Sequence, residues 1–525
     1  MCRMELIKKS IHMNRLKSRV RSEITLDDDF IVPDTKSDIN GVITSEGEVS
    51  IDYVAVSDGK VNVRGRLLFR ILYLCSDGEK RLHNMAGELS FDENMLLKDV
   101  LEGDNVNVKW DIEDLTISII NTRKISAKAV VALEATAENV CDTGIIADVV
   151  VGDGEHVDFI KKEMDVSQIA VNKKDVIRVK AEMEIPSNRG NIQSVLWSTV
   201  RVKNTTIRLM DRGLLVSGEI SVVVLYEGEE NNMVQWMETT VPFSEEIDTE
   251  CSEDMIPDID ICVAMANIVP KPDMDGEPRI LELDMSLELG IKIYREENIS
   301  YISDMYSTSC ELVPEQKMIT YNSIQFKNIS KAKVSDRLKL DSANGNVMQV
   351  FGSDGTVKID EVRISEKDEN NLLIEGVVYV NVMYISSDDS RPVCVARQVI
   401  PFSHEALANG VMKEADIFIR PSLEQLTTVM VGNNEIEAKA VVVLDILAID
   451  TLQTEVIENA KEQPFDMEMI KAIPGMVGYM VKKGDSLWKI AKKYYSSVEN
   501  IKRINDLKDN EINEGEMLLV VKESR

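Results

Sequence analysis

The residues whose types and spacing could do chemistry gather near the end of the chain, around one tryptophan. Trp488 lies between basic side chains and one position beyond Leu487, outside the apolar stripe of a predicted helix, so we expect it to be partly exposed. An exposed tryptophan is a frequent anchor of protein interfaces, although packing inside the module would explain it equally well. The chemistry that these residues indicate is non-covalent recognition.

A group of lysines surrounds Trp488, and its meaning depends on the rest of the chain. The 525 residues hold 91 acidic and 60 basic side chains, a net charge of −31, yet the segment 478–525 holds ten basic and eight acidic ones. A lysine group is usually a solvated helix face, but on so acidic a chain it could also dock on an acidic partner. The group consists of Lys482, Lys483, Lys489, Lys492 and Lys493.

The elements that must position these residues are predicted to be βααβ over residues 479–521. A short strand begins at Tyr479, and the Gly-Asp-Ser turn at 484–486 places Ser486 to cap a helix. Capping explains Ser486 better than ligand binding does. A second helix follows Ser497 and a second strand follows Gly515. The resulting module of about 45 residues is near the lower size limit of a domain without disulfides.

This module resembles the LysM family closely. The shared pattern reads Y-x-V-x-x-G-D-S-L-W-x-I-A from Tyr479, N-x-L from Asn505 and G-x-x-L-x-V from Gly515, although Val521 stands where the family usually has proline. The resemblance implies binding of N-acetylglucosamine polymers in a groove between the loop after the first strand and the loop before the last. The groove residues that it implies are Gly484, Asp485, Ser486, Leu487, Asn510, Glu511 and Ile512, and the candidate partner- or glycan-binding site adds Trp488, Lys489 and Lys492.

One block recurs three times ahead of the module. Each copy has a glycine, then a tyrosine at a constant spacing, then a phenylalanine at a nearly constant one. A further block follows in each copy, at 125–134, 281–290 and 436–445. Spaced blocks that agree three times indicate a tandem repeat. The markers are Gly65, Tyr73 and Phe91 in the first copy, Gly218, Tyr226 and Phe243 in the second, and Gly376, Tyr384 and Phe402 in the third.

The repeated blocks have the pattern of strands. In VNVRGRLLFRILYL at 61–74, apolar residues alternate with three arginines, which is the period of a strand with one buried face. The marker glycines share the apolar face, where they suggest a bend or the close approach of another element. We therefore expect a mainly β chain: three tandem β-rich, sandwich- or barrel-like repeats followed by a small βααβ domain.

The expected boundaries follow from the repeats and from changes in pattern. They are 1–19 for a basic N-terminal segment, 20–140, 160–300 and 317–450 for the three β-domains, 451–477 for a polar linker, and 478–522 for the LysM domain. The N-terminal segment lacks the apolar core of a secretory signal, and we interpret it as a short amphipathic helix at most.

Several classes of function are not supported. The acidic balance disfavours nucleic acid as a partner, and no apolar run is long enough to predict a transmembrane segment. Seven scattered cysteines without a CxxC pair fit reduced thiols in a cytosol. No Walker A, HExxH or GxSxG motif is present, and the four histidines are dispersed. We therefore expect no enzyme, no metal site and no cofactor.

Three β-repeats followed by one LysM resemble the SipL family of spore morphogenesis proteins, whose repeats are called SPOCS domains. The resemblance implies a cytoplasmic protein of the mother cell, located at the forespore surface and spore coat. It implies that the LysM binds the coat morphogenetic ATPase SpoIVA, with other coat proteins as further candidate partners. Two alternatives stay open: a peptidoglycan-binding protein of the cell wall or spore cortex, and a structural coat component whose repeats self-associate.

Overall fold

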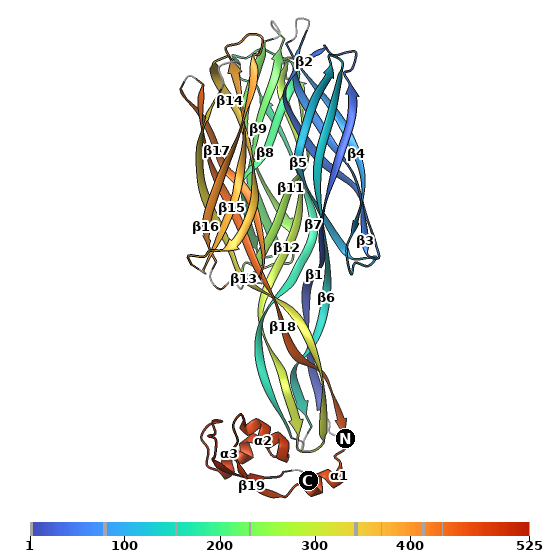
Figure 1. The fold of residues 1–525 in the computed structure, drawn as a ribbon, viewed down its shortest axis with the longest axis vertical. Coiled ribbons are helices and arrows are strands. Elements are labelled where there is room, and N and C mark those ends of the chain that lie inside the picture. The colour runs from blue at the N-terminus through green and yellow to red at the C-terminus, as the bar shows by residue number, and fades with distance from the viewer. Residues whose placement is uncertain are drawn as a thin grey trace.

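The computed structural model describes residues 4–76, 81–152, 156–229, 233–340, 345–368, 370–408, 410, 415–432 and 434–523, and it is built almost entirely of strands. Figure 1 shows a broad head of strands, a narrower stem of paired strands below it, and a small module with helices at the far end of the stem. The fold class expected from the sequence is confirmed, because three β-rich repeats precede a small βααβ module.

Each repeat is a sandwich of two three-stranded antiparallel sheets. In the first repeat the sheets are β1 (Met4–Ile31), β6 (Lys124–Val151) and β5 (Asn105–Asn121), and β2 (Ile39–Ser57), β3 (Lys60–Cys75) and β4 (Leu82–Leu96). In the second they are β7 (Val157–Glu184), β12 (Pro278–Ser307) and β11 (Ile256–Pro272), and β8 (Ile192–Met210), β9 (Gly213–Gly228) and β10 (Val234–Asp248). In the third they are β13 (Glu311–Lys339), β18 (Glu435–Gln463) and β17 (Asp416–Gly432), and β14 (Val347–Ile364), β15 (Asn371–Ser386) and β16 (Val393–Leu407).

The marker residues of the repeat turn out to be cross-strand partners. Gly65 lies directly opposite Phe91, and the other two repeats pair their marker glycine and phenylalanine in the same way. A Cβ on Gly65 would lie 2.7 Å from the Phe91 ring and 2.5 Å from the carbonyl oxygen of Ser50. The close approach expected at the glycine is therefore confirmed, and it explains why a phenylalanine always accompanies it: the ring covers the gap left by the missing side chain.

The stem is made of the first and last strands of every repeat. These six strands are 28 to 30 residues long, and β1, β7 and β13 each shift register against their partner at the point where the sandwich ends. Such a shift bends the pair and re-aims its side chains. These strands form three pairs, β1 with β6, β7 with β12 and β13 with β18, and each pair contacts the other two. The stem core takes a buried residue from every strand: Ile11, Ile145, Val166, Ile299, Ile319 and Val456.

Two of the expected boundaries differ from the structure. Residues 4–19 are not a separate segment or helix but the first part of β1, because Ile11 and Met13 alternate toward the stem core and pair with Thr143 and Cys141. Likewise the expected linker at 451–477 is strand β18 as far as Gln463, followed by α1 (Met467–Ala472). Both stretches are polar on one face because a stem strand has one face in water.

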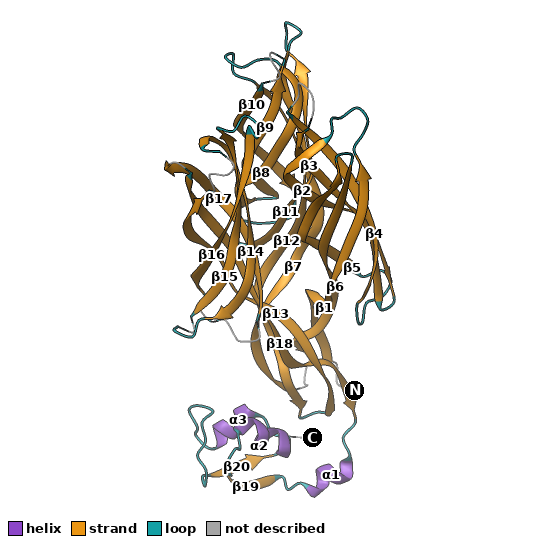
Figure 2. Cartoon of the chain, turned by 45° about the horizontal axis from the view of Figure 1, so that its top comes forward, coloured by secondary structure: helices purple, strands orange, loops and turns teal. Residues whose placement is uncertain are grey.

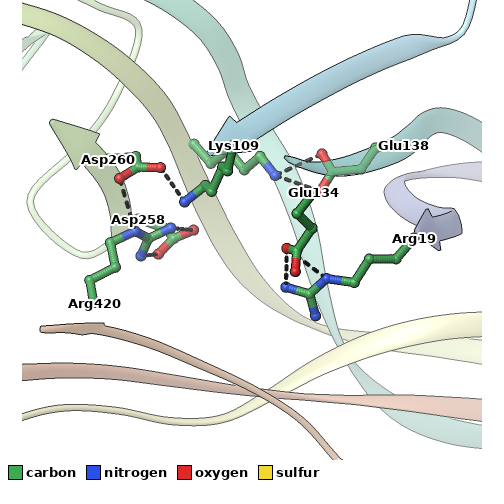
Figure 3. Close-up of polar contacts among 8 residues, drawn as sticks. Arg19, Lys109, Glu134, Glu138, Asp258, Asp260 and Arg420 are labelled. Atoms are coloured by element: carbon green, nitrogen blue, oxygen red, sulfur yellow. Dashed lines mark hydrogen bonds and ion pairs between the residues drawn. The ribbon is translucent and has the colours of Figure 1, made fainter. Parts of the chain in front are cut away.

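Ion pairs tie the repeats together where head and stem meet. Asp260 of β11 binds Lys109 of the first repeat, and Arg420 of the third repeat donates to Asp258 with Nη2–Oδ2 at 2.8 Å (Figure 3). Burial alone would raise the pKa of Asp260, but Lys109 and then Arg420 outweigh it and hold that pKa below its usual value. A second tie between repeats one and two joins Lys292 to Glu138 at 2.7 Å.

A second set of ion pairs lies inside the head. Arg201 of β8 donates to Asp354 of the third repeat through Nε at 2.7 Å and to Glu46 of the first through Nη2 at 2.7 Å. Arg70 also binds Glu46 and stacks over the Trp197 ring of the second repeat at 4.5 Å. One guanidinium thus contacts carboxylates of both other repeats, which fixes their mutual orientation.

The C-terminal module, residues 476–523, holds most of the helix in the described chain (Figure 2). Its elements are β19 (Met476–Met480), α2 (Leu487–Tyr494), α3 (Val498–Ile504) and β20 (Met517–Val521), with β19 and β20 antiparallel. The helices cover one face of the two-stranded sheet, where Tyr479, Leu518 and Val520 join the module core. The expected βααβ order is confirmed.

Candidate binding module

The start of α2 holds two of the predicted site residues in structural roles. The Ser486 hydroxyl accepts a hydrogen bond from the backbone N–H of Lys489 at 3.2 Å, and its backbone is extended, so Ser486 is the N-cap. Leu487 is 2% exposed and packs in the module core. Their side chains therefore stabilise the module, and only their backbone is left to meet a ligand.

The first predicted groove loop is exposed but internally bonded. Gly484 has φ +84°, a conformation that favours glycine, and a Cβ added to it would meet nothing within 4 Å. The Asp485 carboxylate accepts from the backbone N–H of Lys482 at 2.9 Å and from the Tyr479 hydroxyl at 2.8 Å. These two hydrogen bonds, in that order, lower the pKa of Asp485. Lys489 is exposed and donates to the Gly484 carbonyl oxygen at 2.9 Å.

The second predicted groove loop leaves two polar side chains at the surface. Asn510 and Glu511 are exposed, while Ile512 is half-buried against the module core. This loop therefore offers polar groups beside a half-buried apolar side chain, a combination that suits contact with a sugar or a polypeptide.

The module rests on the end of the stem, and we call its contact surface there the seat. The centre of the seat is Tyr306 of β12, which is 5% exposed and packs within the module core. Its hydroxyl lies 2.7 Å from Asp158 Oδ2 and 2.8 Å from the carbonyl oxygen of Ser496, so it can donate to either. Burial, then the Asp158 carboxylate, raise the pKa of Tyr306. The seat consists of Asp158, Asp304, Tyr306 and Glu311.

Trp488 and Lys492 both contact the seat. The Trp488 indole N–H donates to Asp304 Oδ2 at 2.7 Å, and the Lys492 ammonium donates to Oδ1 of the same carboxylate at 2.6 Å. The Trp488 and Tyr306 rings meet edge to face with centroids 4.8 Å apart. Trp488 is indeed only partly exposed, but in this structure its polar atom anchors the module to its own stem. The acidic surface that the basic face of α2 contacts here belongs to the same chain.

The structure therefore divides the ten predicted site residues into three groups. Trp488 and Lys492 meet the seat, and Ser486 and Leu487 have structural roles at the start of α2. The other six, Lys489 among them, lie in or beside the two groove loops at exposed or half-buried positions. The four seat residues were not among the predicted site residues. They lie in or beside strands of the second and third repeats, far from the module in sequence, and an aspartate or tyrosine near a strand end carries no local signal of such a contact.

No other chemistry stands out in the described part of the chain. It contains no group of three or more His, Cys, Asp and Glu side chains arranged to hold a metal ion. Five of its cysteines are free thiols: Cys141, Cys251, Cys262, Cys310 and Cys394. Over the same residues, no helix combines the length and the apolar run needed to cross a bilayer.

Comparison with known families identifies both parts of the chain. The model of the SipL SPOCS domain matches residues 38–120, 191–269 and 346–431, and the LysM model matches residues 479–521. The three SPOCS matches span β2–β5, β8–β11 and β14–β17, so the long stem strands lie outside them. No match was found among curated proteins or solved structures. Both matched domains are non-catalytic binding domains, one related to sporulation and one of a type that binds cell-wall glycan.

Proposed function

We propose that this SipL-like chain, with three SPOCS domains and one LysM domain, is a non-enzymatic assembly factor of the spore coat. In this proposal it acts in the mother-cell cytoplasm at the forespore surface. Its LysM binds a SpoIVA-like coat morphogenetic ATPase, and its SPOCS head and stem hold that contact at a fixed distance from other coat proteins. The observation that carries the proposal is the seat, because it makes the LysM the fixed tip of an elongated scaffold.

The charges of the chain support a protein partner. The net charge of −31 arises wholly outside the segment 478–525, so an acidic protein surface could approach the LysM without the repulsion that most of the chain would exert. The exposed Lys482, Lys483 and Lys489 remain accessible beside the groove loops after the module has docked.

Co-purification with the ATPase tests this proposal. We expect the full chain to bind and a chain truncated after Pro474, which keeps the head and stem but lacks the module, to lose binding by about tenfold or more. Binding that survives the truncation would exclude the LysM as the contact and favour a structural coat component that acts through its repeats.

Peptidoglycan binding remains the second candidate, because the groove loops are exposed. Asn510 and Glu511 have no side-chain role in the module fold, so Asn510→Ala with Glu511→Ala changes the groove without disturbing the core. Sedimentation of the full chain with purified peptidoglycan, lost in this double variant, would favour the glycan. Asp485→Ala is a poorer choice, since Asp485 also bonds Lys482 and Tyr479.

A further inference from the structure

The two outer edges of the LysM sheet differ in whether their backbone groups are hydrogen-bonded. The outer edge of β20 is closed by a side chain: Asn505 accepts from the Leu519 backbone N–H at 2.7 Å and donates to the Leu519 carbonyl oxygen at 2.8 Å. The amide of Asn505 therefore takes the place of a third strand beside β20. A capped edge cannot pair with another chain.

The outer edge of β19 is open, and the register of the sheet shows which groups it presents. In an antiparallel pair, opposite residues point their N–H and C=O groups either toward each other or both away. Leu519 points away from β19, toward Asn505, and Gly478 lies opposite Leu519. The backbone groups of Gly478, and with them those of Met476 and Met480, thus face outward. Within the described part of the chain, no other segment forms a backbone hydrogen bond with these groups.

Two flanking backbone hydrogen bonds confirm which residues of β19 face outward. The backbone N–H of Val481 donates to Glu516 at 2.9 Å, and that of Lys522 donates to Gly475 at 3.0 Å. Residues 475 and 481 are therefore turned toward β20, and the even-numbered residues between them are turned outward.

An exposed apolar face adjoins this open edge. Met476 and Met480 are 61% and 57% exposed, and Met517 and Leu519 on β20 are 67% and 37% exposed on the same face. Gly478 lies between the two methionines of β19 and leaves a notch over Leu519. Flexible methionine side chains around a notch suit an adaptable protein contact better than a sugar.

We propose that the partner binds the LysM by adding an extended strand to the outer edge of β19, with alternate apolar side chains on the Met476–Met480–Met517 face. This inference rests on the proposed function and names its surface. The segment would be alternately apolar, to match the period of a strand, and would carry an acidic residue at the end that reaches the exposed Lys482 and Lys483. Main-chain hydrogen bonds would give affinity and the methionine face would give selectivity.

The occupant is a partner protein rather than a second copy of this chain. Two copies would bring together bodies that each carry a net charge of −31, whereas a partner segment places its acidic end beside two lysines. Both views place β19 on the side of the module away from the stem, so a partner strand would reach this edge without displacing the seat (Figures 1 and 2).

Binding of the purified coat ATPase to the full chain, measured by interferometry, tests the inference with two matched pairs of variants. Gly478→Pro removes an outward N–H, while Gly478→Ala keeps it. Met517→Lys charges the apolar face, while Met467→Lys charges a methionine outside the sheet that is also more than half exposed. We expect the first member of each pair to weaken binding by about tenfold or more and the second to change it less than about twofold. Near-ultraviolet circular dichroism checks that each module is folded.

The outcomes separate this inference from the proposed function. If the full chain binds, and the Gly478→Pro and Met517→Lys variants both bind as well as it does, the edge contact is overturned. The LysM would then still be the binding module. Binding by the chain truncated after Pro474 would overturn both. Dimerisation of the full chain in sedimentation velocity, abolished by Gly478→Pro, would assign the edge to a second copy and also overturn the inference.

Discussion

At the scale of single residues, the contact that fixes the module depends on one tyrosine. Tyr306→Phe removes the hydroxyl shared by Asp158 and the Ser496 carbonyl oxygen, and we expect docking of the module to weaken by about 1–3 kcal/mol. A module that leaves the seat exposes the connection between Gln463 and Met476, so limited proteolysis there should become faster.

A matched control separates this effect from general damage to the stem. Tyr301→Phe removes a hydroxyl that is also buried in the stem but bonds Thr454, at 2.9 Å, away from the module. Cleavage of the connection should stay slow in that variant. Equal cleavage in both variants would mean that the seat does not hold the module.

The marker glycines give a second prediction at this scale. A Cβ on Gly376 would lie 2.3 Å from the Lys358 carbonyl oxygen and 3.2 Å from the Phe402 ring, so Gly376→Ala should destabilise the third repeat by about 1–3 kcal/mol. Gly144→Ala in β6 meets nothing within 4 Å and should be close to neutral. Urea unfolding followed by circular dichroism compares the two midpoints, and similar midpoints would contradict the close-approach argument.

The candidate site could be predicted from sequence only where its residues act locally. The cap role of Ser486 and the buried position of Leu487 were predictable because a cap and a helix stripe are local patterns. The role of Trp488 could not be predicted, since its partner Asp304 belongs to a strand of the second repeat. Helix periodicity indicates that Trp488 is off the stripe, but it cannot tell what covers it.

At the scale of elements, the interior strands were predictable and the stem strands were not. Apolar and polar residues alternate so regularly at 61–74 that the sequence alone predicts strand β3. All its apolar positions on the inner face are buried. The first part of β1 has basic and apolar residues at spacings that suit a helix or a strand. Its conformation is decided by pairing with residues near Cys141, at the far end of the first repeat, which no local pattern contains.

Ion pairs between strands of different repeats predict a dependence on pH. Burial alone would raise the pKa of Glu46, but Arg201 and Arg70 outweigh it and hold that pKa below its ordinary value of 4.5. The stability gained from ionised Glu46 is therefore complete above pH 4.5 and is lost as pH falls through the lowered pKa. We expect Glu46→Gln to lower the melting temperature at pH 7, and we expect the gap from the natural chain to close as the solution is acidified below pH 4.5.

An exposed ion pair in the same sheet is the control for this prediction. Glu88 binds Arg66 at 3.3 Å, with both side chains about half exposed, so Glu88→Gln should cost little at any pH. Loss of the half-buried contacts of Glu46 to two guanidinium groups should cost about 1–3 kcal/mol at pH 7. The ion pairs of Glu46 would be contradicted if the difference in melting temperature between Glu46→Gln and the natural chain stayed constant from neutral pH to well below the ordinary pKa of a glutamate.

At the scale of the whole molecule, three repeats in sequence form one body. The SPOCS matches end at β5, β11 and β17, which suggests three separable domains, yet the strands between the matches build a common stem. The stem core takes residues from all three repeats, and Arg201 joins all three in the head. The repeats should therefore unfold together rather than one at a time, because none can bury its stem strands alone.

Truncation tests whether the three repeats fold as one cooperative unit. A chain ending at Ser309 keeps two complete repeats but removes β13 and β18, and with them Leu312, Ile319, Val456 and Ile457 from the stem core. We expect it to self-associate and to bind a hydrophobic dye, since exposed apolar stem surface has no other cover. A chain truncated after Pro474 keeps all six stem strands, so it should remain monomeric and unfold in one calorimetric transition. A monomeric two-repeat chain that melts at the temperature of the full protein would show that the repeats are independent domains, and the fixed distance between head and LysM would then need another source.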